Sequence, residues 1–550
     1  MNRRQALGRI GSTGIVSALG ALGASPAQAK VRRAPNIVII VADDLGFSDL
    51  GAFGGDIRTP NLDRLARSGL RLSNFHVAPA CSPTRAMLLT GVDHHRAGFG
   101  TFSELIQPNQ VGRPGYEGRI ADGAVCIARR LAAVGYRTMM SGKWHLGEDP
   151  RADPARQGFA RSFALIPGGH NHFGMRRDGK PGIDSEYRED GQRVASLPAD
   201  FYSSNHFTDK LIGYIQETGP DPFFAYLAFT APHYPLQAPP EDIARYRGRY
   251  DDGYAALRRR RLRGLSREGL LPAGASDEDD PGLAALWAAL SDSEKATESR
   301  KMEVFAAMVD RLDQNVGRLI GALSSAAKLD DTVFLFLSDN GAEGTELEHS
   351  AHHSAMGEAI LRGADNSLES IGTARSYCWY GPGWARASSA PFRLFKHFPT
   401  EGGIRVPAFV SGAGIVGGSV SDAYAFVTDI APTLIDWAHA PHPKEAPYFA
   451  YRGTSLRPLL EQRVRNIHDD NASFGWELWG RRAYRRGRWK AVLIPPPEGT
   501  GRWALYDIIA DPGERHDLAE AKPRILASMV RGWHAYARSN GVVLPTISGL

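Results

Sequence analysis

The residues with the clearest chemical potential are a cysteine and an arginine at the start of a short predicted helix. Cys81-Ser82-Pro83-Thr84-Arg85 continues to Thr90-Gly91. Pro83 suits the first helical position and Gly91 the C-terminal stop, so Thr84 to Thr90 is predicted to be helical. Cys81 would then lie at the helix N-terminus, where free backbone N–H groups and the helix dipole favour an anion. Taken alone, Cys81 could equally be a buried structural cysteine.

Two predicted strands each end in a pair of oxygen-bearing side chains. The apolar, β-branched runs 36–42 and 332–338 are typical of strands buried on both faces of a parallel sheet. Open α/β sheets bind ligands at the carboxyl ends of such strands. The residues that follow the two runs are Asp43, Asp44, Asp339 and Asn340. Three carboxylates and an amide suit Ca²⁺ or, less readily, Mg²⁺, and not zinc. For Asp43-Asp44 alone, a solvated turn is the alternative.

Three further segments carry candidate side chains. A short predicted strand, 136–140, leads to Lys143 and His145, which alternate along the chain and could project the same way. They are candidates for binding an anion and transferring a proton. His233 follows another apolar strand and is held between Pro232 and Pro235, and Lys396 precedes a Glu-Gly-Gly sequence. His170 and His172 lie in a glycine-rich loop, and no role is predicted for them.

Length and composition indicate a soluble globular enzyme with a large core. A chain of 550 residues is long enough for one large domain and a smaller one. The predicted division is an export signal at 1–29, a catalytic α/β domain at 30–452 and a C-terminal α+β subdomain at 453–550. The last is inferred from short strand-like segments at 482–484, 489–493 and 503–506, followed by a helix at about 522–537.

The first residues are typical of an export signal. Arg3, Arg4 and Arg9 precede a small-residue apolar run, and Ala27-Gln28-Ala29 offers a cleavage site before Lys30. The Arg3-Arg4 pair suggests the twin-arginine route, so the mature protein is expected in the periplasm or secreted. No later segment is predicted to span a membrane. The signal holds three of the 65 basic residues, so 62 remain against 60 acidic ones, which gives no case for nucleic-acid binding.

The remaining features are interpreted conservatively. Three cysteines form no disulfide framework, and a Cys126–Cys378 bridge is possible but unsupported by spacing. The basic run 258–261 and the acidic run 277–280 are predicted to be solvated charge on a surface excursion. The glycine-rich, aromatic segment 340–398 is expected to form the rim of a cleft.

Taken together, these motifs and their order resemble the sulfatases, most closely the bacterial arylsulfatases, over about residues 35–520. The resemblance rests on Asp43-Asp44, Cys81 to Arg85, Gly142-Lys143-Trp144-His145, Ala231-Pro232-His233, Asp339-Asn340-Gly341, Lys396 and Glu401-Gly402-Gly403. It implies an alkaline-phosphatase-like α/β fold, in which helices sandwich a large, mixed, mostly parallel sheet beside a small C-terminal antiparallel sheet with a helix. It also implies a sulfuric ester hydrolase.

The resemblance further implies the role of each residue. A maturation enzyme would oxidise Cys81 to formylglycine, and Arg85 would steady its hydrate. Calcium would be held by Asp43, Asp44, Asp339, Asn340 and residue 81. Lys143 and Lys396 would bind sulfate oxygens. One hydroxyl of the hydrate would attack sulfur while His233 or Lys396 protonates the leaving oxygen, and His145 would deprotonate the other hydroxyl to expel sulfate.

Two other functions fit the same motifs. A phosphonate or phosphate mono- or diester hydrolase would use the same hydrated aldehyde, and a non-catalytic relative could bind sulfated glycans. Sulfate is favoured because the segment 231–239 resembles arylsulfatases more closely. The expected substrate is a small-molecule or carbohydrate sulfate ester. The natural leaving group, exo- or endo-action and the oligomeric state cannot be inferred from the sequence.

Overall fold

A mixed sheet of ten strands carries the predicted ligands at the ends of its central strands. The computed structural model describes residues 34–176, 185–275, 280–345, 361, 363–442 and 448–546. The order across the sheet is β11-β2-β10-β9-β1-β8-β4-β5-β6-β7. The strands are β1 (Asn36–Ala42), β2 (Leu70–Leu72), β4 (Arg137–Lys143), β5 (Arg161–Leu165), β6 (Tyr187–Glu189), β7 (Gln192–Arg193), β8 (Phe223–Ala228), β9 (Thr332–Ser338), β10 (Ala408–Gly412) and β11 (Ser419–Ser421).

The five central strands run parallel, and their register aligns the two ligand-bearing ends. β9, β1, β8, β4 and β5 pair in parallel, whereas β10 is antiparallel to β9. Ala42 of β1 lies opposite Ser338 of β9, so the Asp43 and Asp339 backbones emerge side by side. Every residue of β1, β8 and β9 is buried, as their continuous apolar sequences predict. The predicted fold class is confirmed.

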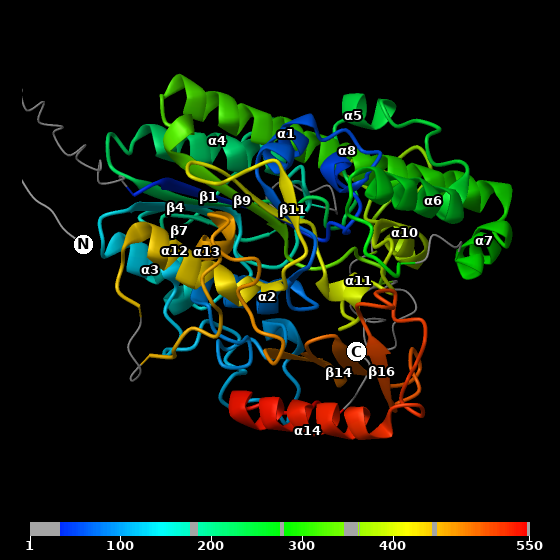
Figure 1. Ribbon diagram of the computed structural model, residues 1–550. Helices are drawn as coiled ribbons and strands as arrows, with labels where there is room; N and C mark the ends of the chain where they lie inside the picture. Colours follow the sequence, from blue (N-terminus) through cyan, green and yellow to red (C-terminus); the bar gives the residue numbers. More distant parts are fainter. Residues whose placement is uncertain are drawn as a thin grey trace, which may run out of the picture. The chain divides into compact units, whose positions relative to one another are not determined.

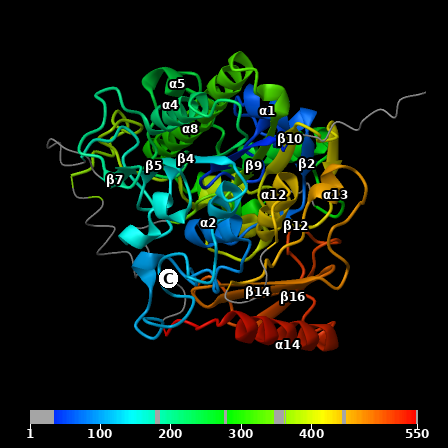
Figure 2. The same cartoon turned by 90° about the vertical axis from the view of Figure 1, so that its left-hand side faces the viewer.

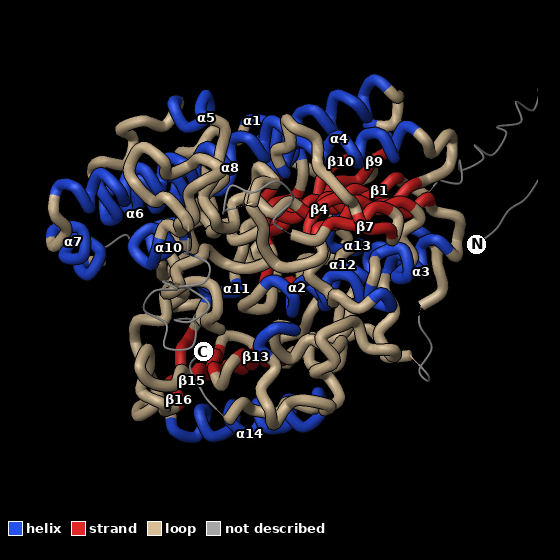
Figure 3. Tube along the Cα trace, turned by 180° about the vertical axis from the view of Figure 1, so that it is seen from behind, coloured by secondary structure: helices blue, strands red, loops and turns tan. Residues whose placement is uncertain are grey.

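Helices cover both faces of this sheet (Figures 1 and 3). One layer contains α1 (Pro60–Ser68), α4 (Ser203–Gln216) and α8 (Asp292–Ser325), and the other contains α2 (Cys81–Thr90), α3 (Ile127–Ala132) and α12 (Ile430–Ala438). α8 begins at a capping box between Ser291 and Glu294, and it buries Phe305, Val309 and Leu312 at helical spacing. Further helices are α5 (Pro240–Ala244), α6 (Gly253–Arg267), α7 (Pro281–Ala288), α10 (Gly381–Ser388), α11 (Glu401–Ile404) and α13 (Arg457–Leu460).

A second, antiparallel sheet of four strands lies near the C-terminus. Its order is β13 (Ser473–Leu478), β14 (Arg481–Arg486), β15 (Trp489–Leu493) and β16 (Trp503–Asp507), and α14 (Pro523–Asn540) crosses it (Figures 1 and 2). Three strands and the helix match the prediction, whereas β13 was not anticipated. A small two-stranded sheet joins β3 (Phe75–His76) to β12 (Ala425–Phe426). Residues 34–550 form one compact unit, and the boundary at 452/453 remains a prediction.

Buried charged groups join the small sheet to the rest of this unit. Lys490 Nζ of β15 lies 2.8 Å from Glu401 Oε1 and 2.9 Å from Glu514 Oε1. His95, which follows α2, contacts Glu477 of β13 through Nε2 at 3.1 Å. Because buried charges are tolerated only when paired, these contacts fix the position of the small sheet.

The prediction of solvated charge in the basic run is wrong for two arginines. Arg261 is fully buried and lies 3.0 Å from Asp49 and 2.9 Å from Asp56. Arg258 is also buried and donates to the carbonyls of Arg386 and Pro391, each at 2.8 Å. The run lies in α6, and the face of this helix that carries Arg258 and Arg261 packs against the core. A run of consecutive arginines does not show which of them lie on that face. The acidic residues 277–279 lie outside the described residues.

Three other expectations concern thiols and targeting. Cys81, Cys126 and Cys378 are all buried free thiols, so there is no Cys126–Cys378 bridge. Within the described ranges no helix has the length and apolar character needed to cross a membrane. The predicted export signal lies outside the described residues.

Candidate active site

Cys81 is the first residue of α2, three residues earlier than predicted. The helix runs Cys81–Thr90, all of it buried, and ends at Gly91 with φ +68°, a left-handed conformation that glycine adopts without strain. Cys81 Sγ lies 3.3 Å from Asp43 Oδ1. The structure therefore places the predicted cysteine against the end of β1.

The four predicted metal ligands are buried together at the ends of β1 and β9. Asn340 Nδ2 donates to Asp44 Oδ1 at 2.7 Å, and the Asp44 backbone N–H points to Asp339 Oδ1 at 3.4 Å. Asn340 Oδ1 is buried and has no hydrogen-bond partner among the described residues. Potential ligand atoms of Asp43, Asp44, Cys81 and His233 all lie within 4.8 Å of one another.

Three cations surround these carboxylates. Lys143 Nζ lies 2.6 Å from Asp43 Oδ2, and Arg85 Nη2 lies 2.7 Å from Asp339 Oδ2. Lys396 Nζ lies 2.8 Å from Asp44 Oδ1 and 2.9 Å from Glu343 Oε2. Lys143 is the last residue of β4 and not part of a loop, so its position is set by the sheet. Glu343 was not predicted, although it follows the Asp339-Asn340-Gly341 turn by only two residues.

Burial and neighbouring charges shift the pKa values of two carboxyl groups of the cluster in opposite directions. Burial would raise the pKa of Asp43, but Lys143, His233 and Arg85 outweigh burial and hold this pKa well below its usual range. Burial also raises the pKa of Asp44, to about 8, because Asp43 and Glu343 add to the effect and Lys396 only partly opposes it. Burial raises the pKa of the Cys81 thiol well above its usual value. An unmodified Cys81 is therefore a poor source of thiolate.

His145 lies on one wall of the site, next to a carboxylate that was not predicted. Its Nε2 is 3.3 Å from Glu104 Oε1, and its ring stacks on Phe102 at a centroid distance of 5.5 Å. His145 Nδ1 is buried with no partner among the described residues. Burial lowers the pKa of His145, and Glu104 partly opposes this. The ring is therefore neutral near pH 7, as a proton acceptor requires.

His233 lines the same cavity, and His170 and His172 contact the turn that carries it. His233 Nε2 is 3.6 Å from Asp44 Oδ2, and its Nδ1 lies 2.6 Å from the Tyr234 carbonyl. His172 Nε2 contacts the His233 carbonyl at 3.0 Å, and His170 Nε2 contacts Thr230 Oγ1 at 2.8 Å. These two histidines therefore stabilise the turn that carries His233.

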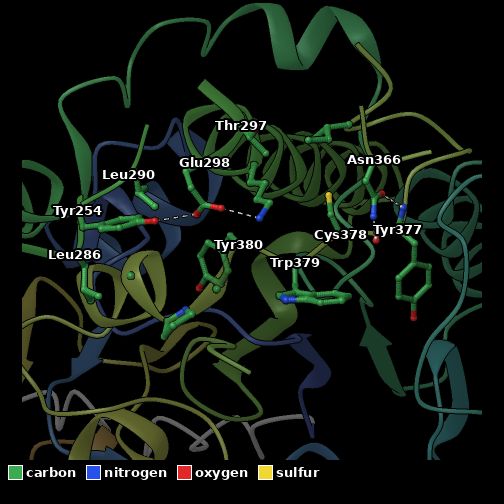
Figure 4. A pocket seen from close by; sticks show the side chains of 15 residues that line it. Tyr254, Leu286, Leu290, Thr297, Glu298, Asn366, Tyr377, Cys378, Trp379 and Tyr380 are labelled. Carbon is green, nitrogen blue, oxygen red and sulfur yellow. Dashed lines mark hydrogen bonds and ion pairs between the residues drawn. The ribbon is translucent and has the colours of Figure 1, made fainter. Parts of the chain in front are cut away.

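A cavity of about 360 Å³ opens over Cys81, and it is lined by His145, His233 and Lys396. The segment 340–398, expected to form the rim of a cleft, contributes Thr345, Tyr377, Lys396 and His397 to this cavity. The sequence did not predict the contributions of Phe102, Glu104, Glu148 and Trp479. These residues come from separate loops and from the β13–β14 turn, and no short motif connects them. A second cavity, of about 320 Å³, lies near Tyr254, Leu290 and Trp379 (Figure 4) and contains none of the predicted catalytic residues.

Comparison with known proteins decides which family combines this fold with this site. A family model described as Sulfatase matches residues 35–440. The chain belongs to the sulfatase family. It is 44% identical over 527 residues to an uncharacterized sulfatase of Schizosaccharomyces pombe, covering 92% of this chain and 94% of that one. It is 36% identical to an arylsulfatase of Klebsiella aerogenes, covering 82% and 97%.

Solved structures agree with this assignment. Ps i-CgsB, crystallised with k-i-k-neocarrahexaose, is 25% identical to this chain with a TM-score of 0.66, and the match covers 94% of this chain and 95% of that one. The human arylsulfatase A sequence matches over 530 residues at 29% identity. This sulfatase is accordingly a sulfuric ester hydrolase.

Proposed function

We propose that this sulfatase hydrolyses aryl-type sulfate monoesters at a formylglycine made from Cys81, beside a calcium ion. The observation that carries the proposal is the placement of Cys81. It begins a buried helix, lies 3.3 Å from Asp43, and shares one cavity with His145, His233 and Lys396. Formylglycine and calcium are typical of the family, and the relatives named arylsulfatases support the aryl substrate.

The residues present fit a hard divalent cation. Asn340 Oδ1 is buried without a hydrogen-bond partner among the described residues, and burial together with Asp43 and Glu343 raises the pKa of Asp44 to about 8. A divalent cation among these groups would offset the repulsion between their carboxylates. Asp43, Asp44, Asp339 and Asn340 would hold the ion, with residue 81 completing the set. All are oxygen donors once Cys81 is oxidised, which suits Ca²⁺, and Mg²⁺ is the alternative. When bound, the ion would withdraw charge from a sulfate oxygen.

The chain's own residues account for binding of an anionic ester. Lys143 and Lys396 are buried cations whose present partners, Asp43 and Asp44, are proposed metal ligands. With those carboxylates serving as metal ligands, the ammonium groups of Lys143 and Lys396 would be available to bind sulfate oxygens. Arg85 remains paired with Asp339 and holds the N-terminal turn of α2 in position.

Two histidines account for proton transfer. The hydrated aldehyde would supply two hydroxyl groups on one carbon, one of them the nucleophile toward sulfur. His233, or Lys396, protonates the leaving oxygen. Burial lowers the pKa of His233 well below its usual range, and a sulfate ester bound beside it would raise that pKa again. His145 takes the proton of the second hydroxyl, which allows sulfate to leave.

Parallel assays with 4-nitrophenyl sulfate and a phenyl phosphonate ester test the substrate. We expect the larger kcat/KM on the sulfate, and a much larger value on the phosphonate would overturn the proposal.

Elemental analysis of protein purified without added metal tests the identity of the ion. One calcium per chain is expected, whereas stoichiometric zinc would contradict the ligand set.

A further inference from the structure

We infer that the outer part of the active-site cavity selects uncharged, planar leaving groups and rejects those that carry a second negative charge, with Glu148 as a determinant of this selectivity. The inference rests on the proposed function, because it concerns the part of the ester that the sulfate-binding groups do not touch. It is carried by the distribution of charge and aromatic rings along the cavity.

The inner end of the cavity holds its positive charge. Lys396 is the only lysine or arginine among the described residues that line the cavity, and Asp44 and Glu343 flank it. Lys143 and Arg85 lie deeper, against Asp43 and Asp339. All three cations are buried next to Cys81, so they serve the sulfate group and are out of reach of a second anion further out.

The exposed end of the cavity carries two carboxylates, and within the part of the chain that the structure describes no lysine or arginine lines that end. Glu104 is half exposed and lies 3.3 Å from His145, and Glu148 is exposed. Both line the same cavity. A leaving group with its own carboxylate or sulfate would therefore bring like charges together, which is unfavourable and only partly screened by water.

The rest of the cavity wall is aromatic. Phe102 and Trp479 pack in one buried cluster with Cys81, and their ring centroids lie 5.7 Å apart. Trp479 also packs on His397 at a centroid distance of 4.6 Å, and its indole nitrogen donates to Thr101 Oγ1 at 2.9 Å. Tyr234 and Tyr377 line the same cavity, with ring centroids 6.1 Å apart. Such fixed rings offer flat apolar contact to a planar leaving group.

Two esters of the same shape test the inference. We would compare 4-sulfooxybenzamide, whose leaving group is uncharged, with 4-sulfooxybenzoate, whose leaving group is anionic. The preference is the ratio of kcat/KM on the amide to kcat/KM on the carboxylate. Comparing this preference between wild type and a variant cancels the intrinsic difference in reactivity of the two esters.

Glu148→Gln is the informative variant, because Glu148 is exposed and outside the proposed catalytic machinery. Glu520→Gln, at an exposed glutamate that does not line the cavity, is the matched control. We expect Glu148→Gln to reduce the preference for the amide by about two- to tenfold, as for like charges a few ångströms apart near a surface. Glu520→Gln should leave it unchanged. Added salt should raise kcat/KM on the carboxylate in wild type more than in Glu148→Gln.

Either of two results would overturn this inference and leave the proposed function intact. One is an unchanged preference in Glu148→Gln, and the other is a wild-type enzyme that favours the carboxylate ester. If the mature wild type hydrolyses neither ester, the proposed function fails, and this inference fails with it.

Discussion

At the scale of single residues, Asp43 connects most of the groups that the chemistry needs. One of its carboxylate oxygens faces Cys81 and the other faces Lys143, with Arg85 Nη2 3.6 Å away. An acidic residue after a buried strand was predicted as a metal ligand. Its contacts with the N-terminus of α2 and with Lys143 at the end of β4, two strands away, were not, because they depend on strand order. The side chain therefore belongs at once to the proposed metal site and to the proposed sulfate-binding site.

His233 gives the first prediction at this scale. If its ring protonates the leaving oxygen, His233→Ala should lower kcat/KM by about 10²- to 10⁴-fold on phenyl sulfate. The loss should be much smaller on 4-nitrophenyl sulfate, whose leaving group needs little help from a proton. Rates on a series of substituted phenyl sulfates would measure this. An equal loss on every ester would indicate that His233 only shapes the site.

Metal removal gives the second prediction. Without a metal, Asp44 has a pKa of about 8 against an ordinary value of 3.8, so burying its charge destabilises the fold. The fold favours the neutral, protonated form of Asp44, so the free energy of unfolding is highest below about pH 4 and falls as pH rises toward 8. Metal binding should reverse the loss. A chelator should therefore lower Tm more at about pH 8 than at about pH 6. An equal decrease at both pH values would show that Asp44 is not a ligand.

At the scale of elements, sequence patterns predicted strands better than the contacts between them. The runs that became β1, β8 and β9 are largely apolar and wholly buried, and the structure brings the residues that follow β1 and β9 together as predicted. α2 began earlier than expected, because Pro83 lies inside its first turn and not at its first residue. β13 was not predicted, although it contains Glu477 and is followed directly by Trp479, which lines the cavity. Its relation to the site depends on the packing of two sheets.

The contact between α2 and the small sheet gives a third prediction. His95 lies between Asp93 at 3.3 Å and Glu477 at 3.1 Å, and Tyr536 of α14 donates to Asp93 at 2.9 Å. Burial would lower the pKa of His95, but these carboxylates raise it to about 9. The charged ring therefore contributes about 3 kcal/mol of stability, present below about pH 6.5 and lost as pH rises through 9.

His95→Gln tests this contribution. The variant should have a lower Tm than wild type at about pH 6, and the difference should shrink as pH rises beyond 9. Thermal unfolding followed across this range is the measurement. A difference that does not vary with pH would mean that His95 acts by packing alone.

At the scale of the whole molecule, the order of motifs along the chain was sufficient to predict the family and the fold. The rest of the cavity wall could not be predicted, because Phe102, Glu148 and Trp479 meet only after the chain has folded. The basic run in α6 was misinterpreted for a related reason. Whether Arg261 faces solvent depends on Asp49 and Asp56, about two hundred residues earlier in the chain.

Export is the prediction for the chain as a whole. If residues 1–29 are a signal, mature protein should begin at or near Lys30, which N-terminal sequencing of periplasmic material would show. Replacing Arg3 and Arg4 by lysine should block export through the twin-arginine route. Undiminished export of that variant would indicate the general secretory route. Folding before export would also let Cys81 be oxidised in the cytoplasm.

The central claim is that residue 81 acts through two hydroxyl groups on one carbon, and Cys81→Ser tests it most directly. Serine has one hydroxyl, so it can attack sulfur while Lys143 and Lys396 bind the ester, but His145 then has no second hydroxyl to deprotonate. We predict a burst of about one leaving group per active site, then near-complete arrest, with a stable sulfate ester on the tryptic peptide that contains residue 81. Steady turnover without a burst or an adduct would contradict the account.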